Sequence, residues 1–231
     1  MNILIVGGSS DIGLNLAKYL KDNNYNVIAT YNEHEFNISG ITSLKCNLLE
    51  EKDIEKTIKY VNDKYGRIDV LINMAAIYYD DEFLNLTKEE LMNAFEVNLV
   101  GAFLMCQAYE RNTKNGMVIN IGSTDGIDTY NEYNIIYSMT KAALINMTKS
   151  ISMTSQNRIY CLCPNWIDSD STKKTDKTYL LNELKRINQS RLITKEEFNE
   201  TINNIINNKN IETGSIIKLD VKEDELWIEK I

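Results

Sequence analysis

The sequence predicts an α/β fold: a doubly wound parallel sheet of about seven strands with helices on both faces, forming a three-layer sandwich. Short apolar runs alternate with helical patterns along almost the whole chain, which is the pattern of a parallel sheet buried on both sides. No repeat, low-complexity linker or shift of composition divides the 231 residues. We therefore expect a single domain over 1–231.

Composition narrows the class of protein. The chain is 43% hydrophobic and 25% charged, as is usual for soluble globular proteins. Its formal net charge of −8 argues against broad binding to nucleic acid or anionic membranes. No apolar run approaches the roughly 20 residues that a membrane span needs, and the chain opens directly on a predicted strand, so we expect no signal peptide. The four cysteines and single histidine lack zinc-ligand spacing, which predicts no metal site and favours a reducing, cytoplasmic compartment.

The first predicted strand, 3–6, leads into a partly glycine turn at 7–13 and then into a helix whose apolar residues recur over 14–20. Glycines let the backbone come close to a ligand, and the N–H groups of a helix N-terminus favour a phosphate. This order of elements indicates a dinucleotide-binding turn. An ordinary strand–turn–helix corner is the alternative.

The later elements follow from local patterns. Further strands are expected at 27–30, 43–48, 69–73, 117–122, 158–163 and 216–219. Helices are expected through 54–61 with an end at 65–66, over 88–110, over about 135–154 and, as a short helix, at 202–206. The long helix begins with the capping-box residues Thr87 and Glu90. The stretch 31–43 predicts no helix, and 168–195 is polar and lysine-rich without firm periodicity.

Ligands of such sheets bind beyond the carboxyl ends of the strands. Several loops of this chain are expected to converge there on one crevice: 7–13, 31–32, 47–48, 73–76, 122–126 and 164–169.

Four polar residues near this crevice break the local pattern. Asn98 lies on a buried helical stripe and needs a partner, either as a structural amide or as a kink or water anchor near an active site. Tyr137 and Lys141 are four residues apart on one helix face, and a nearby cation brings the pKa of a tyrosine closer to working pH. Ser123 follows a strand at the crevice, where its hydroxyl could hold a carbonyl oxygen beside the tyrosine. A surface tyrosine with a solvated lysine is the alternative.

Together these residues resemble the short-chain dehydrogenase/reductase family, in its compact single-domain type, over almost the whole chain and in the same order. The turn 7–13 is similar to the family's cofactor-binding Gly-x-x-x-Gly-x-Gly, with Asp11 in place of the middle glycine. Residues 46–48 resemble the adenine-contacting segment, with Asn47 where an aspartate is usual. Residues 73–76 resemble Asn-Asn-Ala-Gly with two departures.

The catalytic positions of the family match without departure. Asn98 matches its structural and catalytic asparagine, 120–123 match the strand that ends in the catalytic serine, and 137–141 match Tyr-x-x-x-Lys. Residues 164–169 resemble the Pro-Gly segment that meets the nicotinamide, with Asn165 in place of the glycine.

The resemblance implies a Rossmann-like fold and hydride transfer between a nicotinamide dinucleotide and a carbonyl or alcohol. In the reducing direction Tyr137 would donate a proton to the carbonyl oxygen, to which Ser123 would hydrogen-bond. Lys141 would hold the nicotinamide ribose and lower the pKa of Tyr137, and Asn98 would anchor a water that relays protons to Lys141. The implied cofactor-binding residues are Gly7, Ser9, Ser10, Asp11, Ile12, Gly13, Tyr31, Asn32, Asn47, Leu48, Asn73, Ala75, Tyr137, Lys141, Pro164 and Ile167.

The residues that follow the second strand indicate whether NAD or NADP is bound, because sites for NAD place a carboxylate there against the ribose hydroxyls. Tyr31 and Asn32 stand there, so repulsion of a 2′-phosphate is reduced and NADP(H) is favoured. No arginine in 30–32 or in the glycine turn is available to bind that phosphate, and Glu33 could supply a carboxylate. NAD(H) therefore stays possible.

The family sets its substrate in the loop after the proline segment, here about 168–195. The basic residues of this loop include Lys173, Lys174, Lys177, Lys185, Arg186 and Arg191. They indicate either a solvated surface or a basic lid over an acidic or carrier-bound substrate such as a 3-oxoacyl thioester. We expect a small-molecule substrate and self-association as a dimer or tetramer through the helices 88–110 and 135–154.

Two other functions are alternatives to this one. The altered glycines and Asn47 allow a dinucleotide-binding sensor or regulator without turnover, although the matching catalytic residues oppose it. An extended family member acting on nucleotide sugars would need a larger substrate domain than 231 residues supply.

Overall fold

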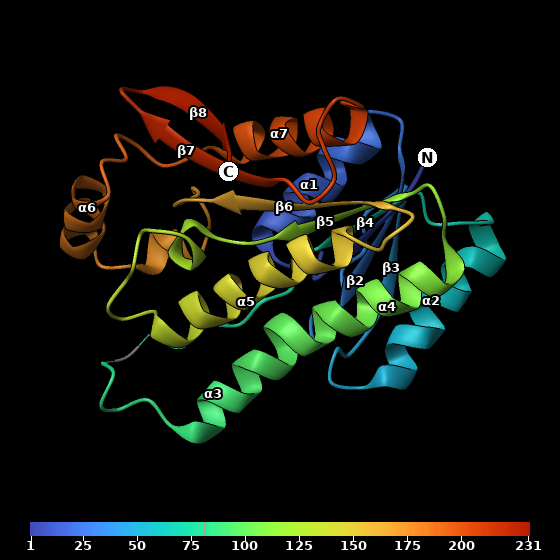
Figure 1. The fold of residues 1–231 in the computed structure, drawn as a ribbon, viewed down its shortest axis with the longest axis horizontal. Coiled ribbons are helices and arrows are strands. Elements are labelled where there is room, and N and C mark those ends of the chain that lie inside the picture. The colour runs from blue at the N-terminus through green and yellow to red at the C-terminus, as the bar shows by residue number, and fades with distance from the viewer. Residues whose placement is uncertain (81) are drawn as a thin grey trace.

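Eight strands form one sheet in the order β3-β2-β1-β4-β5-β6-β7-β8 (Figure 1). The computed structural model describes residues 1–80 and 82–231. The strands are β1 (Asn2–Val6), β2 (Asn26–Tyr31), β3 (Ile41–Lys45), β4 (Val70–Asn73), β5 (Met117–Ile121), β6 (Arg158–Pro164), β7 (Ile216–Lys222) and β8 (Glu225–Lys230). Strand β1 pairs in parallel with β2 on one side and with β4 on the other, so the strand order reverses at β1. In an open α/β sheet the ligand crevice lies at such a reversal.

Helices cover both faces of this sheet. They are α1 (Asp11–Asp22), α2 (Glu51–Tyr65), α3 (Lys88–Phe95), α4 (Ala102–Asn112), α5 (Ile135–Ser152), α6 (Lys177–Arg186) and α7 (Lys195–Asn207). Figure 1 shows α1 and α7 on one face and α2, α4 and α5 on the other. Leu16 and Phe198 belong to the core under the first pair, and Ile58 and Met105 to the core on the opposite face. The predicted α/β sandwich of three layers is confirmed.

The sheet has one strand more than predicted, and that strand runs antiparallel. Glu223 and Asp224 connect β7 to β8, with φ angles of 51° and 65°. Two central residues with positive φ make the tight turn that suits a twisted hairpin. Neither of them is glycine or asparagine, so the sequence carries no hairpin signal and the prediction ended the sheet at β7.

The long helix predicted over 88–110 is interrupted. Between α3 and α4 the backbone makes a π-helical turn, Glu96–Gly101, with Asn98 inside it. A π-turn inserts an extra residue into the helical repeat and re-aims the side chains around it. A kink at Asn98 was one of the interpretations of its buried amide, but the sequence did not predict a π-turn because the apolar stripe continues on both sides of it.

The stretch Lys88–Asn112, which contains this turn, is also the one helix of the described residues long and apolar enough to cross a membrane. No run of that kind was expected from the sequence. Met105, Cys106 and Tyr109 of this stretch are buried in the core that α2 shares with the sheet. Packing within the fold accounts for these apolar residues.

Two helices near the C-terminus are better defined than the sequence predicted. Within 168–195 the chain forms a 3-10 turn, Thr172–Lys174, and then α6, which Asp176 caps. Helix α7 begins seven residues before the predicted 202–206, because Thr194 and Glu197 form a capping box at its start.

Candidate active site

Two adjoining cavities lie at the carboxyl ends of the strands. The β1–β2 cavity, of about 440 Å³, is bordered by the glycine turn, residues 30–34 and residues 46–49. The β5–β6 cavity, of about 330 Å³, is bordered by the ends of β5 and β6, by α5 and by the loop after β6. Ser10, Met74 and Ala76 line both. The two cavities therefore form one elongated crevice across the strand reversal.

The glycine turn lies directly against the loop after β4. Gly7 has a φ of +80°, and a Cβ there would lie 2.6 Å from Ala75 Cα, so only glycine fits this approach. The Gly7 N–H donates to Thr30 Oγ1 at 3.0 Å, which ties the turn to the end of β2. The turn is therefore a fixed cradle rather than a loose loop.

Helix α1 points its N-terminus at the crevice. Ser10 caps it, with its Oγ accepting from the Gly13 N–H at 3.1 Å. Within the described part of the chain, the N–H groups of Asp11 and Ile12 have no protein acceptor. Backbone donors of this kind, with the helix dipole behind them, fit the pyrophosphate of a dinucleotide.

Asp11, the first residue of α1, is bound by protein groups on both carboxylate oxygens. Its Oδ1 accepts from Lys195 Nζ at 2.6 Å, and its Oδ2 accepts from the Asp170 N–H at 2.9 Å. Burial opposes the charged form, but these hydrogen bonds hold the pKa of Asp11 below its usual value. The charge at the family's middle-glycine position is thus paired with the first residue of α7.

Asn98 is 1% exposed and its amide is bonded to two other segments. Its Oδ1 accepts from the Ile77 N–H at 2.8 Å, and its Nδ2 donates to the Ile77 carbonyl at 2.8 Å and to Thr140 Oγ1 at 3.0 Å. The amide fastens the loop after β4 and helix α5 to the π-turn. Both of its N–H donors are used by protein partners, so the side chain itself has none left to offer a water.

Asn98→Ala should lower the free energy of unfolding by about 3 kcal/mol, because it leaves buried groups of Ile77 and Thr140 without partners. Urea denaturation followed by circular dichroism measures this. The matched control is Asn93→Ala on α3, which loses a single hydrogen bond to Tyr79, so we expect less than about 1 kcal/mol. Equal losses for the two variants would show that the Asn98 amide is not the structural fastener inferred here.

Ser123, Tyr137 and Lys141 line the β5–β6 cavity together. Lys141 Nζ donates to the Ile121 carbonyl at 2.7 Å and lies 5.2 Å from the centroid of the Tyr137 ring. Burial of this ammonium lowers the pKa of Lys141 to about 8. The lysine is thus able to exchange a proton close to neutral pH.

The pKa of Tyr137 is raised, whereas the sequence predicted that it would be lowered. Burial and the charge of Asp125 raise it above the usual tyrosine value, and a hydrogen bond from Ser123 opposes them. Lys141 was expected to lower this pKa, but its ammonium is held by the Ile121 carbonyl and lies over the ring. The phenol is therefore protonated through the neutral range.

Most of the residues that the sequence assigned to the site border one of the two cavities. Those lining them are Gly7, Ser9, Ser10, Ile12, Tyr31, Asn32, Asn47, Leu48, Ala75, Ser123, Tyr137, Lys141, Pro164 and Ile167. Asp11, Gly13, Asn73 and Asn98 do not line them. Asn73 is turned into the core, where its Nδ2 donates to Asn120 Oδ1 at 2.9 Å and to Cys106 Sγ at 3.3 Å.

Sequence reasoning missed Asp125, which also lines the β5–β6 cavity. Its Oδ1 accepts from Thr129 Oγ1 at 2.6 Å, and burial raises its pKa. The available signal was its place two residues after Ser123, within a loop already assigned to the crevice. Tyr78 and Trp166 were not singled out either, and both border the same cavity.

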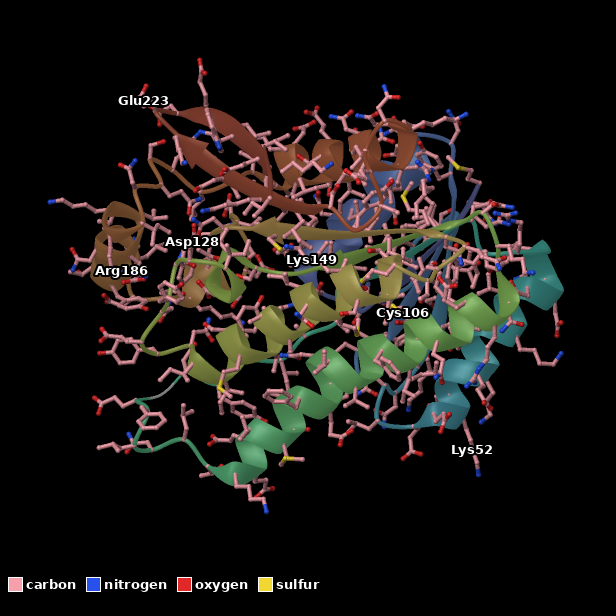
Figure 2. All side chains as sticks on the ribbon, viewed as in Figure 1. Lys52, Cys106, Asp128, Lys149, Arg186 and Glu223 are labelled. Carbon is pink, nitrogen blue, oxygen red and sulfur yellow. The ribbon has the colours of Figure 1, made fainter. Side chains whose placement is uncertain are left out.

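The basic residues of 168–195 do not form a basic lid over the β5–β6 cavity. Acidic neighbours pair with three of the six named from the sequence: Lys173 with Asp168, Arg186 with Glu183 and Arg191 with Glu197. Lys195, the last residue of the stretch, pairs with Asp11. Arg186 also donates to the Thr129 carbonyl, and Figure 2 shows it at the same end of the molecule as Asp128. Lys174 is the one of the six that borders a cavity described here, and that cavity lies farther out. Among the described residues, no cluster of His, Cys, Asp and Glu fits a metal ion.

Comparisons with known proteins agree with this geometry. Residues 1–180 match the model of the family described as short chain dehydrogenase. Carbonyl reductase family member 4 of Xenopus laevis is 30% identical over 180 residues, covering 73% of this chain and 76% of that one. The 3-oxoacyl-[acyl-carrier-protein] reductase MabA of Mycobacterium avium is 27% identical over 203 residues, covering 85% and 78%.

Among solved structures, a 3-ketoacyl-(acyl-carrier-protein) reductase from Brucella melitensis superposes with a TM-score of 0.85 at 17% identity, covering 97% of this chain and 98% of that one. This likeness shows the shared fold. The family match over the glycine turn, the Ser123 strand and the Tyr137 helix shows more: the chain belongs to the short-chain dehydrogenase/reductase family of oxidoreductases.

Proposed function

We propose that this protein transfers hydride between the nicotinamide of NAD(P)(H) and the carbonyl or alcohol carbon of a small substrate. One observation carries the proposal: Ser123, Tyr137 and Lys141 line a cavity that continues through Ser10 into the crevice beside the glycine turn. The N-terminus of α1 would hold the pyrophosphate of such a dinucleotide, and the residues around Tyr137 would hold its nicotinamide. We propose that residues 1–231 form a single domain that binds this cofactor.

The chain's own groups have distinct parts in this mechanism. A bound nicotinamide supplies or accepts the hydride. In reduction Tyr137 donates its phenolic proton to the carbonyl oxygen, which Ser123 holds by a hydrogen bond. Lys141 orients the nicotinamide ribose and returns a proton toward Tyr137, for which its pKa of about 8 suits it. Asn98 acts as a positioning residue, since its amide fixes Thr140 in the middle of the Tyr-x-x-x-Lys helix.

For the cofactor we propose NADP(H), with NAD(H) as the alternative. Tyr31 and Asn32 line the β1–β2 cavity without a carboxylate, which leaves room for a 2′-phosphate. Glu33 and His34 line it as well, and Glu33 would disfavour that phosphate. The Brucella melitensis reductase was crystallised with NADH, so the shared fold admits the unphosphorylated cofactor.

Fluorescence titration with NADPH and NADH, followed by a screen of small ketones, tests the proposal. We expect tighter binding of NADPH and turnover of at least one ketone. Cofactor binding without turnover on a broad panel would favour a dinucleotide sensor, the second candidate. The similarity to 3-oxoacyl reductases makes an acetoacetyl thioester a necessary member of the panel.

Asp125→Asn should move the alkaline limb of the pH–rate profile for ketone reduction to lower pH by about one unit. The Asp125 carboxylate raises the pKa of Tyr137, as Cys163 and Tyr78 also do, while Ser123 opposes them. Removing this charge lowers the pKa of Tyr137, and reduction needs the protonated phenol. The control is Asp128→Asn, at a residue labelled in Figure 2. Asp128 is an exposed carboxylate of the same loop and is paired with Lys218. If the alkaline limb of the profile did not move in Asp125→Asn, the Asp125 carboxylate would not be one of the groups that raise the pKa of Tyr137.

We propose self-association as a dimer or tetramer through α4 and α5. Their surfaces carry Phe103 and Met139, which are 43% and 45% exposed. Phe103→Glu should convert the assembly to monomers, because it places charges in an apolar interface, and light scattering after size exclusion measures this. A wild-type chain that elutes as a monomer would refute the proposal. The four cysteines are free and buried, which supports the cytoplasmic prediction.

A further inference from the structure

A third cavity, called here the outer cavity, continues the β5–β6 cavity toward the surface. Its volume is about 340 Å³. Tyr78, Asn134 and Trp166 are among the residues that line both, so a ligand in the outer cavity reaches the neighbourhood of Tyr137. The outer cavity is therefore the natural place for the part of the substrate that does not react.

Aromatic rings make the walls of the outer cavity. They are Tyr78, Tyr133, Trp166 and Tyr179. The rings of Tyr133 and Tyr179 meet edge to face, with centroids 5.6 Å apart, and the Tyr179 hydroxyl donates to Asn131 Oδ1 at 3.1 Å. Among the described residues, no Ala, Val, Leu, Ile or Met lines this cavity. Such walls suit a ligand with apolar ring faces and polar edges.

The polar lining of this cavity combines two carboxylates with amide and hydroxyl groups that can both accept and donate hydrogen bonds. Asp80 and Asp176 border it, with Lys174 as the one cation, and Asp125 lies just inside in the β5–β6 cavity. Asn134 hydrogen-bonds to Asp125, and its own Oδ1 is buried without any partner. A buried acceptor without a donor costs free energy, and because Asn134 lines this cavity, a ligand hydroxyl that reached its Oδ1 would supply the missing donor.

We propose that the outer cavity binds a neutral ring bearing several hydroxyl groups, a monosaccharide or a cyclic polyol. This inference rests on the proposed function and names its substrate class. Hydroxyl groups donate to the carboxylates and to Asn134, while the C–H faces of the ring pack on the tyrosines and Trp166. In oxidation a ring carbon would give its hydride to NAD(P)⁺ and its hydroxyl proton to Tyr137, as the phenolic proton of Tyr137 passes to the neutral form of Lys141, and a ketone or lactone would be left.

A long acyl chain fits the same lining poorly. Alkyl groups gain about 0.8 kcal/mol per buried CH₂ where apolar surface encloses them, and among the described residues this lining offers aromatic faces but no aliphatic side chain to surround a flexible chain. The phosphates of an acyl carrier would approach Asp80 and Asp176 and be repelled. We therefore expect carrier-bound 3-oxoacyl thioesters to be poor substrates.

Binding is tested first, independently of turnover. The chain has two tryptophans, and Trp227 lies on β8 away from the cavity, so Trp227→Phe leaves Trp166 as the sole reporter. With NADP⁺ present, myo-inositol and D-glucose are expected to change the Trp166 fluorescence with saturation, and with a Kd at least about tenfold below that of cyclohexanol. A response to the polyols no stronger than that to cyclohexanol overturns the inference.

Turnover then separates this inference from the proposed function. We expect kcat/KM for myo-inositol to exceed that for cyclohexanol about 100-fold or more, because unpaired polar groups in the site penalise a ligand without hydroxyls. Asn134→Leu should lower that ratio at least about tenfold. Glu132→Gln, an exposed neighbour outside the lining, is the matched control and should leave the ratio unchanged.

Different results would overturn the proposed substrate class and the proposed oxidoreductase activity. Oxidation of cyclohexanol or reduction of ketones without a preference for polyols would overturn the substrate class and leave the oxidoreductase standing, as would an acetoacetyl thioester that proved the best substrate. Saturable polyol binding without turnover of any substrate would keep the ligand class and reject the enzyme.

Discussion

Tyr137→Phe is expected to lower kcat for ketone reduction by about 10³-fold while the Kd for NADPH changes by less than about twofold. Phenylalanine keeps the ring under Lys141 but removes the hydroxyl, the proton donor nearest to a carbonyl held by Ser123. The cofactor contacts of the glycine turn and of residues 31–32 are untouched, so binding should persist. Single-turnover kinetics with NADPH and a fluorescence titration measure the two effects.

The control is Tyr130→Phe, which removes a hydroxyl from a tyrosine that is 75% exposed in the loop before α5. This variant should react at the wild-type rate. If Tyr137→Phe retained a tenth or more of the wild-type rate, another group would have to be the acid, and the nearest candidate is the Asp125 carboxyl, whose pKa burial raises.

Lys195→Met is expected to weaken NADPH binding by about tenfold, which corresponds to about 1.4 kcal/mol. The substitution leaves the Asp11 carboxylate without its cation, beside the helix N-terminus that would receive the pyrophosphate. An unpaired negative charge there repels the phosphates. The side chains of Lys195 and Asp11 are partly exposed, at 21% and 27%, so solvent screening keeps the loss of NADPH affinity modest.

The matching double variant identifies the cause. Asp11→Gly with Lys195→Met removes both charges and restores the glycine usual in the family, so NADPH affinity should return to near the wild-type value. Lys18→Met, an exposed lysine on α1, makes the same change in net charge and should have little effect. If Lys18→Met weakened binding as much as Lys195→Met, long-range charge rather than the Asp11 pair would be responsible.

The parts of the site that the sequence predicted well depend on residues that lie close together in the sequence. A buried strand, the turn with Gly7 and the start of α1 lie within a few residues of one another, so their order alone indicates the cradle. Tyr137 and Lys141 share a helix face because of their spacing, and the structure places both in the β5–β6 cavity. The roles assigned to them stay predictions until the variants are measured.

The parts that the sequence did not predict depend on contacts between distant segments. The partner of Asp11, Lys195, lies 184 residues away. The π-turn around Asn98 follows from its bonds to Ile77 and Thr140, which belong to a loop and another helix. The hairpin that adds β8 has Glu223 and Asp224 in a conformation with positive φ. These residue types do not predict that conformation from the sequence.

Periodicity, glycine placement and capping residues by themselves determined the α/β class, the order of the elements and the crevice on which the loops converge, because each of these depends on the chemistry of residues close together along the chain. Only the tertiary structure decided the direction in which the pKa of Tyr137 moves, the pairing of Asp11 and the lining of the outer cavity. The physical reason is that burial and electrostatic environment come from side chains that folding brings together from far apart in the sequence.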